Sequence, residues 1–325
     1  MRSIIVTGGS GFLGSHLLGA LSLIPDIRVT VIDRIPPKAS MIGLQYINWD
    51  IRQRYSEVAL DSSQNSSVLI HLAALCKEPG YEWDQYFESN YVGTKNVCEF
   101  AERNGIHDII FTSTMMVFRP GEKKNSEEDL TAPDTAYGIS KLLAEEVLSA
   151  WKNSDPRNRL KIVRPGVVFG KGENGNYARL YNALKRNTFA YVGRKDTIKG
   201  SIYVKEVVEF LLFLMTDKSE RVIYNLAFPD PDTIRVISET ICEVMGWRRY
   251  VPVLPFKLLL ASSYLFEFLN YLGLKNPVHH RRIEKLYYST HLSSQAALNA
   301  GFNFKHDLHS AIEDWKKECG GKGLF

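Results

Sequence analysis

The stretch that decides the fold is IIVTGGSGFLG, which covers residues 4–14. Its apolar and β-branched residues predict a buried strand at Ile4–Thr7, and the pattern that follows predicts a helix over Phe12–Leu23. The turn between them holds three glycines with the spacing G-x-x-G-x-x-G, namely Gly8, Gly11 and Gly14. Such glycines allow a tight turn, a close approach of the backbone to a pyrophosphate, and close packing of the helix on the strand. Strand, glycine turn and helix together predict a dinucleotide-binding site.

The rest of the first half of the chain alternates short β-branched runs with helical segments. The expected strands are Val29–Asp33, Val68–Ala73, Ile109–Thr114 and Lys161–Arg164. The expected helices are about Asp84–Asn104 and Tyr137–Lys152, and a loop rich in Glu, Lys and Pro runs from the strand Ile109–Thr114 to about Ala136. Because strands and helices alternate, the sequence predicts an α/β fold with a doubly wound parallel sheet of the Rossmann type, covered by helices on both faces.

The pattern becomes less regular after Arg164. The expected strands here are Ser201–Val204 and Val222–Ala227, and the expected helices are Thr233–Met245, Phe256–Leu272 and His309–Lys317. We therefore divide the chain into a dinucleotide-binding domain, residues 1–168, and a smaller C-terminal α/β substrate lobe, residues 169–325. Small-molecule sites usually lie between two such lobes.

The composition is that of an ordinary globular protein, with 325 residues of which 45% are hydrophobic and 23% charged. A net charge of +4 suits anionic cofactors and substrates, but without a long basic stripe it does not indicate nucleic-acid binding. The four cysteines, Cys76, Cys98, Cys242 and Cys319, lack the spacing of a zinc site and fit a reducing compartment. We therefore expect a cytoplasmic protein with no metal site.

The longest apolar stretch, Val253–Leu274, is interrupted by Lys257, Glu267 and Asn270. Because a membrane span needs about 20 mostly apolar residues, we expect a buried or interfacial helix here and no transmembrane segment. The aromatic-rich part, Phe256–Leu272, leaves open a contact with a membrane surface.

An acidic residue, Asp33, ends the second expected strand, nineteen residues after Gly14. A carboxylate at this place accepts hydrogen bonds from the adenosine ribose and repels a 2′-phosphate. The sequence therefore favours NAD over NADP. Arg34 points the other way, because an arginine beside the ribose accommodates that phosphate.

A tyrosine and a lysine, Tyr137 and Lys141, stand four residues apart at the start of an expected helix. Residues with this spacing share a helix face, so both can reach one cofactor. A nearby ammonium lowers the pKa of a phenol, and such a tyrosine exchanges a proton with a hydroxyl or a carbonyl. Thr114, at the carboxyl end of an expected strand, can hydrogen-bond the same substrate oxygen. The three residues are the candidate catalytic groups of a hydride-transfer site.

Taken together, these residues resemble the extended short-chain dehydrogenases/reductases, the group that contains UDP-galactose 4-epimerase and other nucleotide-sugar enzymes. The resemblance runs essentially from end to end of the chain. The motifs that carry it are Thr7–Gly14, Asp33, Asp50-Ile51, His71–Ala74, Asn90–Thr94, Thr112–Thr114, Tyr137–Lys141 and Arg164-Pro165.

The resemblance implies a role for further residues. Asp50 and Ile51 would hold the adenine, and the cofactor pocket would otherwise be formed by Phe12, Leu13, Leu72, Ala73, Ala74, Asn90, Thr112 and Pro165, with Lys141 on the nicotinamide ribose. On the substrate side the resemblance implies Val167, Asn176 in the loop Gly172–Asn176, Lys199, and Arg281 or Arg282. The two phosphates of a nucleotide sugar need such charged donors. A homodimer through the helices near 84–104 and 137–152 is also implied.

Two departures from the family pattern bear on the reaction. Met115 and Met116 follow Thr114 where the dehydratases of the family carry Asp-Glu, so the groups that eliminate water are missing. Val167 stands where the 4-epimerases usually carry asparagine, a position at which ketoreductases are freer.

The sequence thus leads to an NAD-dependent nucleotide-sugar epimerase that acts at C4, with a UDP-sugar as the first candidate substrate. A nucleotide-sugar 4-ketoreductase that uses the same residues once is the alternative. A dinucleotide-binding sensor without turnover is a third possibility, which the intact Thr114, Tyr137 and Lys141 disfavour.

Overall fold

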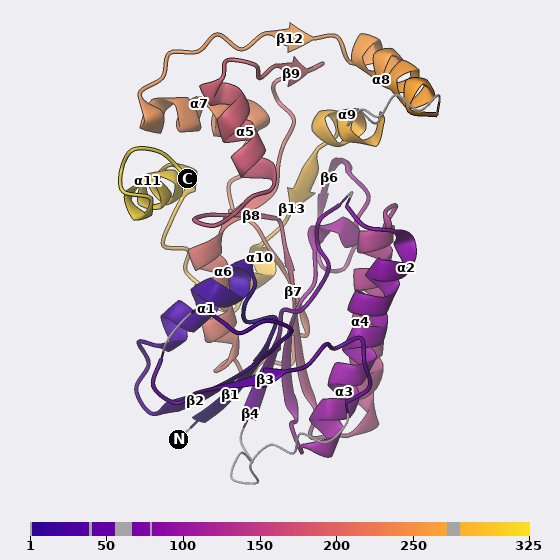
Figure 1. Ribbon diagram of the computed structural model, residues 1–325, viewed down its shortest axis with the longest axis vertical. Coiled ribbons are helices and arrows are strands. Elements are labelled where there is room, and N and C mark those ends of the chain that lie inside the picture. Colours follow the sequence, from indigo (N-terminus) through magenta and orange to yellow (C-terminus); the bar gives the residue numbers. More distant parts are fainter. Residues whose placement is uncertain (1, 39–40, 56–66, 79, 272–279) are drawn as a thin grey trace.

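The computed structural model describes residues 2–38, 41–55, 67–78, 80–271 and 280–325 (Figure 1). Its centre is a seven-stranded parallel sheet with the strand order β11-β7-β5-β4-β1-β2-β3. The strands are β1 (Arg2–Thr7), β2 (Ile27–Asp33), β3 (Leu44–Asn48), β4 (Ser67–His71), β5 (Asp108–Thr112), β7 (Arg159–Pro165) and β11 (Ile223–Leu226). The order reverses at β1, which makes the sheet doubly wound and confirms the predicted fold.

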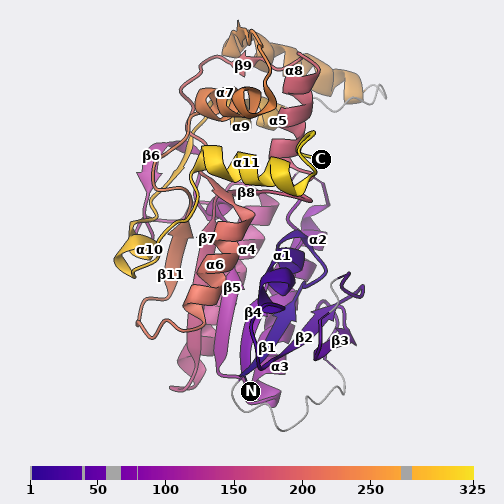
Figure 2. The ribbon, with the colours of Figure 1, turned by 90° about the vertical axis from the view of Figure 1, so that its left-hand side faces the viewer.

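Helices cover both faces of this sheet (Figures 1 and 2). One face carries α1 (Phe12–Leu21) and α6 (Val204–Leu214). The other carries α2 (Trp83–Tyr86), the π-helix η1 (Phe87–Val92), α3 (Gly93–Arg103) and α4 (Ala136–Ser154). Along β1, Ile4 and Val6 belong to the core under α1 while Ile5 belongs to the core under α3 and α4. A strand buried on both faces explains the continuous apolar run.

The second part of the chain forms the lobe above the carboxyl edge of the sheet (Figure 1). Its helices are α5 (Asn176–Lys185), α7 (Ile234–Met245), α8 (Phe256–Tyr271), α9 (His280–Tyr287), α10 (Gln295–Asn299) and α11 (Leu308–Glu318). Three parallel strand pairs link distant segments, namely β8 (Val167–Phe169) with β10 (Ser201–Tyr203), β9 (Tyr191–Val192) with β12 (Val253–Leu254), and β6 (Gly121–Asn125) with β13 (Thr290–Leu292). The core under α1 continues into this lobe, because it includes Tyr177, Ile237 and Trp315.

The structure differs from the prediction in several places, and β3 and α5 are among the elements that were not expected. The expected loop before Ala136 contains β6, a polar strand that forms only because it pairs with β13, far away in the sequence. The expected helix 84–104 includes the π-helical turn η1. Helix α6 was not expected, because its apolar residues directly continue the strand β10. Leu272, the expected end of α8, lies outside the described residues.

The large sheet takes its last strand, β11, from beyond residue 168. The division of the chain at residues 168 and 169 therefore stays a prediction, and the chain crosses back to the sheet after it has entered the second lobe.

Candidate active site

The glycine turn has no room for side chains. Gly8 adopts a φ of +74°, and a Cβ on it would lie 2.6 Å from the Ala73 nitrogen. A Cβ on Gly14 would overlap the Gly8 carbonyl oxygen and lie 2.6 Å from the Cα of Gly9. The first position therefore brings the backbone against the 72–74 segment, and the last brings α1 against the turn. This is the cradle that a pyrophosphate requires.

The amino end of α1 is open toward an anion. Its N-cap, Gly11, supplies no side-chain hydrogen bond, and the first turn carries no acidic residue. The first turn of the helix itself therefore adds no carboxylate that would oppose its peptide dipoles. Phe12 and Leu13, the next two residues, are partly buried against the core under α1. These contacts fix the direction of the helix.

The carboxylate of Asp33 lies directly beside this turn. Its Oδ2 accepts a hydrogen bond from the Ser10 amide at 3.0 Å, and its Oδ1 accepts one from the Arg34 amide at 2.7 Å. Arg34 is exposed. Because Asp33 joins the end of β2 to the glycine turn, its place fits the ribose-binding acid of NAD enzymes.

The two residues assigned to the adenine differ in exposure. Asp50 forms a two-pronged ion pair with Arg52, with Nε–Oδ1 at 3.0 Å and Nη2–Oδ2 at 2.6 Å, and this hydrogen bonding lowers the pKa of Asp50. The Ile51 side chain is buried and packs against Gly93, so it supports α3 from below. Its carbonyl oxygen accepts a hydrogen bond from Asn96 at 2.6 Å.

Asn90 holds the segment after β4 in place. Its Oδ1 accepts from the Leu75 amide at 2.8 Å, and its Nδ2 donates to the Leu75 carbonyl at 3.0 Å and to the Ser140 hydroxyl at 2.9 Å. Leu72 donates its amide to the Thr7 carbonyl at 3.0 Å. Asn90 is buried and sits within the π-helical turn η1. Such turns are common at functional sites. Leu72 and Ala73 thus lie against the glycine turn, and the cofactor contact of Leu72, Ala73 and Ala74 stays a prediction.

A buried polar chain that we did not predict from the sequence joins β1 to α3. The Thr7 hydroxyl lies 2.6 Å from His71 Nδ1, and His71 Nε2 lies 3.1 Å from the Thr94 hydroxyl, which donates to the Asn90 carbonyl at 2.6 Å. Burial, with a smaller effect of Lys141, lowers the pKa of His71 to about 3. The imidazole is therefore neutral at physiological pH. Its role is to fix the strand ends around the turn.

The three candidate catalytic residues come together. Thr114 follows β5 and is buried, and its hydroxyl lies near enough to the phenol of Tyr137 to lower the pKa of that phenol. Burial raises the pKa of Tyr137, the Cys76 thiol adds to this effect, and Thr114 opposes it. The expectation that the Lys141 ammonium lowers this pKa is not met in the structure, in which Thr114 has that effect.

Lys141 is 2% exposed, and its Nζ lies 3.9 Å from the centre of the Phe111 ring. A cation over an aromatic face is attracted to it. Burial nevertheless lowers the pKa of Lys141 to about 7, while Glu145 acts in the opposite direction. Tyr137, Lys141 and Glu145 have the spacing i, i+4 and i+8, which places them on one face of α4.

The partner of this lysine, Glu145, forms a buried ion pair with Arg164 of β7. Arg164 Nη2 lies 2.6 Å and Nε 3.0 Å from the two carboxylate oxygens, and the Ser113 hydroxyl donates to the same carboxylate. The residues are 4% and 3% exposed. From the sequence, Arg164 is predicted only as part of a motif, and Glu145 has no predicted role. The signal that could have revealed Glu145 is the continued spacing of four residues along α4.

Two further cofactor positions lie at the carboxyl ends of strands. Thr112 ends β5, and its hydroxyl is buried with no hydrogen-bond partner among the described residues. Pro165 ends β7 and is buried. An unsatisfied buried hydroxyl at this edge fits a bound polar group.

Comparison with known proteins decides the family. Residues 4–227 match the sequence profile of the NAD dependent epimerase/dehydratase family. The chain belongs to this family of NAD-dependent enzymes. The glycine cradle, Asp33 and the unsatisfied Thr112 hydroxyl fit NAD, which is the cofactor of the family.

Two relatives are similar in sequence. The N-acetyl-alpha-D-glucosaminyl-diphospho-ditrans,octacis-undecaprenol 4-epimerase of Escherichia coli O157:H7 is 28% identical over 322 residues, which cover 96% of this chain and 93% of the relative. A UDP-glucose 4-epimerase of Neisseria meningitidis serogroup C is 30% identical over 206 residues, which cover 59% of this chain and 60% of the relative.

Solved structures support the fold. A UDP-glucuronic acid 4-epimerase from Bacillus cereus in complex with NAD has a TM-score of 0.73 at 20% identity, covering 98% of this chain and 99% of that chain. A UDP-galactose 4-epimerase has a TM-score of 0.70 at 20% identity, with the same coverage.

The residues predicted to bind the substrate lie in different surroundings from one another. The loop before α5 passes beside the cofactor turn, because a Cβ on Gly172 would lie 3.8 Å from the Phe12 ring. Asn176, at the start of α5, is exposed and accepts a hydrogen bond from Arg179 at 2.7 Å. Val167 lies in β8 and packs against the core under α1, so its side chain has a structural contact.

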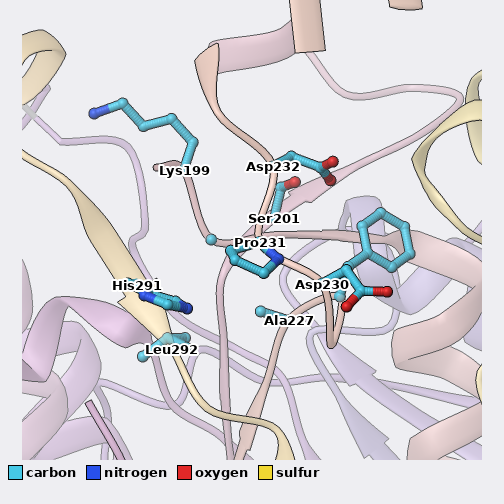
Figure 3. Close-up of a pocket in the computed structure, with 10 residues that line it drawn as sticks. Lys199, Ser201, Ala227, Asp230, Pro231, Asp232, His291 and Leu292 are labelled. Carbon is cyan, nitrogen blue, oxygen red and sulfur yellow. The ribbon is translucent and has the colours of Figure 1, made fainter. Parts of the chain in front are cut away.

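Lys199 does not point into the hollow beside it. Figure 3 shows its ammonium directed away from Asp230 and Asp232. It donates to the Lys285 carbonyl at 2.8 Å and to the Tyr288 carbonyl at 2.7 Å, which are at the end of α9. Burial lowers the pKa of Lys199 to about 7. The structure therefore gives this lysine a helix-capping contact in place of the open position that the resemblance implied.

The hollow itself is lined by residues from the range 199–292, in the second part of the chain, and not by Tyr137. Its lining includes Ser201, Asp232 and His291 (Figure 3). Burial, reinforced by Asp307 and Asp230, raises the pKa of Asp232 to about 6. A carboxylate wall repels a diphosphate, so this hollow is not the diphosphate site.

The remaining substrate residues, Arg281 and Arg282, have their backbone in α9, but their side chains lie outside the described part of the structure. Within the described residues no group of three or more histidine, cysteine, aspartate or glutamate side chains could hold a metal ion. None of the helices described has the length and apolar character to cross a membrane.

Proposed function

We propose that the protein is a 4-epimerase that acts on a sugar linked to a diphosphate. The observation that carries this proposal is the meeting of Thr114, Tyr137 and Lys141 beside the glycine turn, at the carboxyl edge of the sheet. Ligands of open α/β sheets bind at this edge. The full-length similarity to a 4-epimerase supports the same reaction.

In the proposed reaction Tyr137 transfers the proton of the sugar hydroxyl. The Thr114 hydroxyl hydrogen-bonds both the phenol and the sugar oxygen, and so fixes the path of the proton. NAD, when bound, supplies an acceptor and donor of hydride. The Lys141 Nζ lies over the Phe111 ring, and the charge of Glu145 favours its protonated form against the burial that lowers its pKa to about 7. Because burial raises the pKa of Tyr137, its phenolate is a stronger base toward the proton of the sugar hydroxyl, and the phenol holds that proton until the return step.

Two candidates exist for the group that carries the sugar, a nucleotide and a lipid. A UDP-sugar is the substrate that the sequence predicts, and the partial similarity to UDP-glucose 4-epimerases supports it. The relative that matches nearly the whole chain acts, by its name, on N-acetylglucosamine carried by undecaprenyl diphosphate. Both kinds of substrate carry a sugar on a diphosphate, so the end of the molecule that reacts is of the same kind.

A 4-ketoreductase is the second candidate, and Val167 is the observation that favours it. Because the Val167 side chain packs against the core, a valine at this position is also compatible with an epimerase. The two reactions differ in stoichiometry, because only a reductase consumes reduced nicotinamide. We also propose, from the resemblance, a cytoplasmic homodimer paired through α3 and α4.

The test is an incubation of the purified protein with UDP-N-acetylglucosamine or UDP-glucose, and with N-acetylglucosamine on a polyprenyl diphosphate, each without added reductant. We expect one of them to be converted to its 4-epimer while absorbance at the reduced-nicotinamide band stays flat. Product that forms only with added reduced nicotinamide, mole for mole, would favour the reductase.

A further inference from the structure

The end of the molecule farthest from the N-terminus consists of β12, α8 and α9 (Figures 1 and 2). Large apolar side chains are exposed there. We call them the distal apolar residues, and they are Tyr250, Val253, Leu254, Leu258, Tyr264 and Leu286, with exposed fractions of 86%, 43%, 39%, 66%, 50% and 44%. Scattered exposed apolar residues are common, but six on one end of a molecule mark an interaction surface.

Helix α8 is too apolar for a helix at the periphery. Its sequence, FKLLLASSYLFEFLNY, contains two charged residues, Lys257 and Glu267. It packs chiefly against α9 among the described elements, and Lys257 and Leu258 are both exposed. A helix with so few charged residues usually packs one side against a protein core or against lipid. No described helix could cross a membrane, so the lipid contact that fits α8 lies along a bilayer surface.

The charge of this end fits an anionic surface. Residues 246–271 and 280–287 contain six basic and two acidic side chains, a net charge of +4, which equals that of the whole chain. The remaining residues of the protein therefore have no net charge. Of these basic residues, Arg248 and Lys257 are exposed next to the distal apolar residues. Basic residues that flank apolar ones are typical of segments that bind anionic lipids.

The surface is held in a fixed shape. The Phe256 ring stacks on Tyr287 with ring centres 4.0 Å apart, and His280 Nδ1 lies 2.8 Å from Glu267. Lys199 binds the last carbonyls of α9 and so joins this end to the strand β10 in the substrate lobe. Docking therefore needs no refolding of α8.

We propose that this distal surface docks on the anionic lipid bilayer. Its use rests on the proposed function, because a sugar on a polyprenyl diphosphate stays anchored in the membrane. The carboxyl edge of the sheet faces the same end of the molecule as α8 and α9 (Figure 1), and Tyr137 is the second residue of α4. An enzyme docked in this way meets the sugar and the diphosphate at the membrane surface while the lipid chain remains in the bilayer.

The experiment is cosedimentation of the full chain with vesicles of phosphatidylcholine alone, or of phosphatidylcholine mixed with phosphatidylglycerol. We expect binding to the mixed vesicles, weakened by salt, and little binding to the neutral ones. The double variant Lys257→Glu with Leu258→Ser should bind at least about tenfold more weakly, since it reverses a charge and removes an apolar contact at the surface.

The matched control is Leu23→Ser with Arg28→Glu, which makes the same changes at two exposed residues in and after the turn that follows α1. This variant should bind like the wild type. Equal loss in both double variants, or no preference of the wild type for mixed vesicles, would overturn the proposal. A second copy of the chain is the other candidate to cover this surface, and light scattering tests for it. If the changes at Lys257 and Leu258 split a dimer but leave vesicle binding unchanged, the surface is a dimer interface.

Docking and catalysis are separated by a second readout. The distal variant should keep the wild-type rate on any water-soluble substrate and lose rate on the lipid-linked sugar in vesicles. Vesicle binding without epimerase activity would leave docking intact and refute the proposed function. Epimerase activity without vesicle binding would support the proposed function and refute the docking.

Discussion

The buried pair Glu145–Arg164 gives the sharpest prediction for the scaffold of the site. In the variant Glu145→Gln the shape of the side chain is kept and its charge is removed. Arg164 would keep a positive charge at 3% exposure, with its Nη1 already unpartnered among the described residues. Breaking one side of such a pair costs about 3–5 kcal/mol, because an uncompensated charge remains buried. That is a large fraction of a total stability of about 5–15 kcal/mol.

The assay is urea denaturation of the variant and of a neighbouring control, Glu146→Gln. Glu146 is exposed on the same helix, so its change should stay within about 0.5 kcal/mol. The apolar double variant Glu145→Leu with Arg164→Met should regain most of the loss, since it buries no charge. If Glu145→Gln is as mild as Glu146→Gln, the pair does not support the sheet and α4 in the way described here.

The remaining predictions concern the cofactor turn and Lys141. Gly8→Ala should abolish NAD binding, measured by calorimetry, because the added Cβ would meet the Ala73 backbone and Gly8 has a positive φ. Gly19→Ala, with open space around it in α1, should raise the stability by up to about 1 kcal/mol. Equal effects of the two variants would refute the role of the glycine turn as a cradle. Because the pKa of Lys141 is about 7 when folded and 10.5 when unfolded, the unfolded chain binds the extra proton between these values. Its contribution to the free energy of unfolding should therefore rise with pH over this window, by about 1.4 kcal/mol per pH unit at most. Lys141→Met should flatten that rise in urea denaturation, and an unchanged slope would contradict the buried position of the ammonium.

The parts of the fold with a local signal could be predicted from the sequence. The glycine turn was visible because Gly8 and Gly14 leave no room for a Cβ, and β1 was visible because both of its faces are buried. The strand β6 could not be predicted, since its polar residues pair with β13 only in the folded chain.

The candidate catalytic side chains could be proposed from the sequence as a set, but their environments could not be predicted. The pKa of Tyr137 depends on its burial and on Thr114, and the pKa of Lys141 on its burial and on Glu145. These are tertiary properties. Lys199 shows the same limit, because its position in a motif implied a substrate contact while its ammonium binds the carbonyls at the end of α9. Charge alone does not tell where a flexible side chain ends.

The central claim is that one site removes and returns the same hydrogen at C4. The most direct measurement uses a substrate with deuterium at C4, incubated with catalytic amounts of the wild-type protein and NAD, with the product followed by NMR. The account predicts that the 4-epimer keeps its deuterium, and that Tyr137→Phe lowers the rate by about 10²–10⁴-fold. Loss of the deuterium to water, or an undiminished rate in Tyr137→Phe, would contradict it.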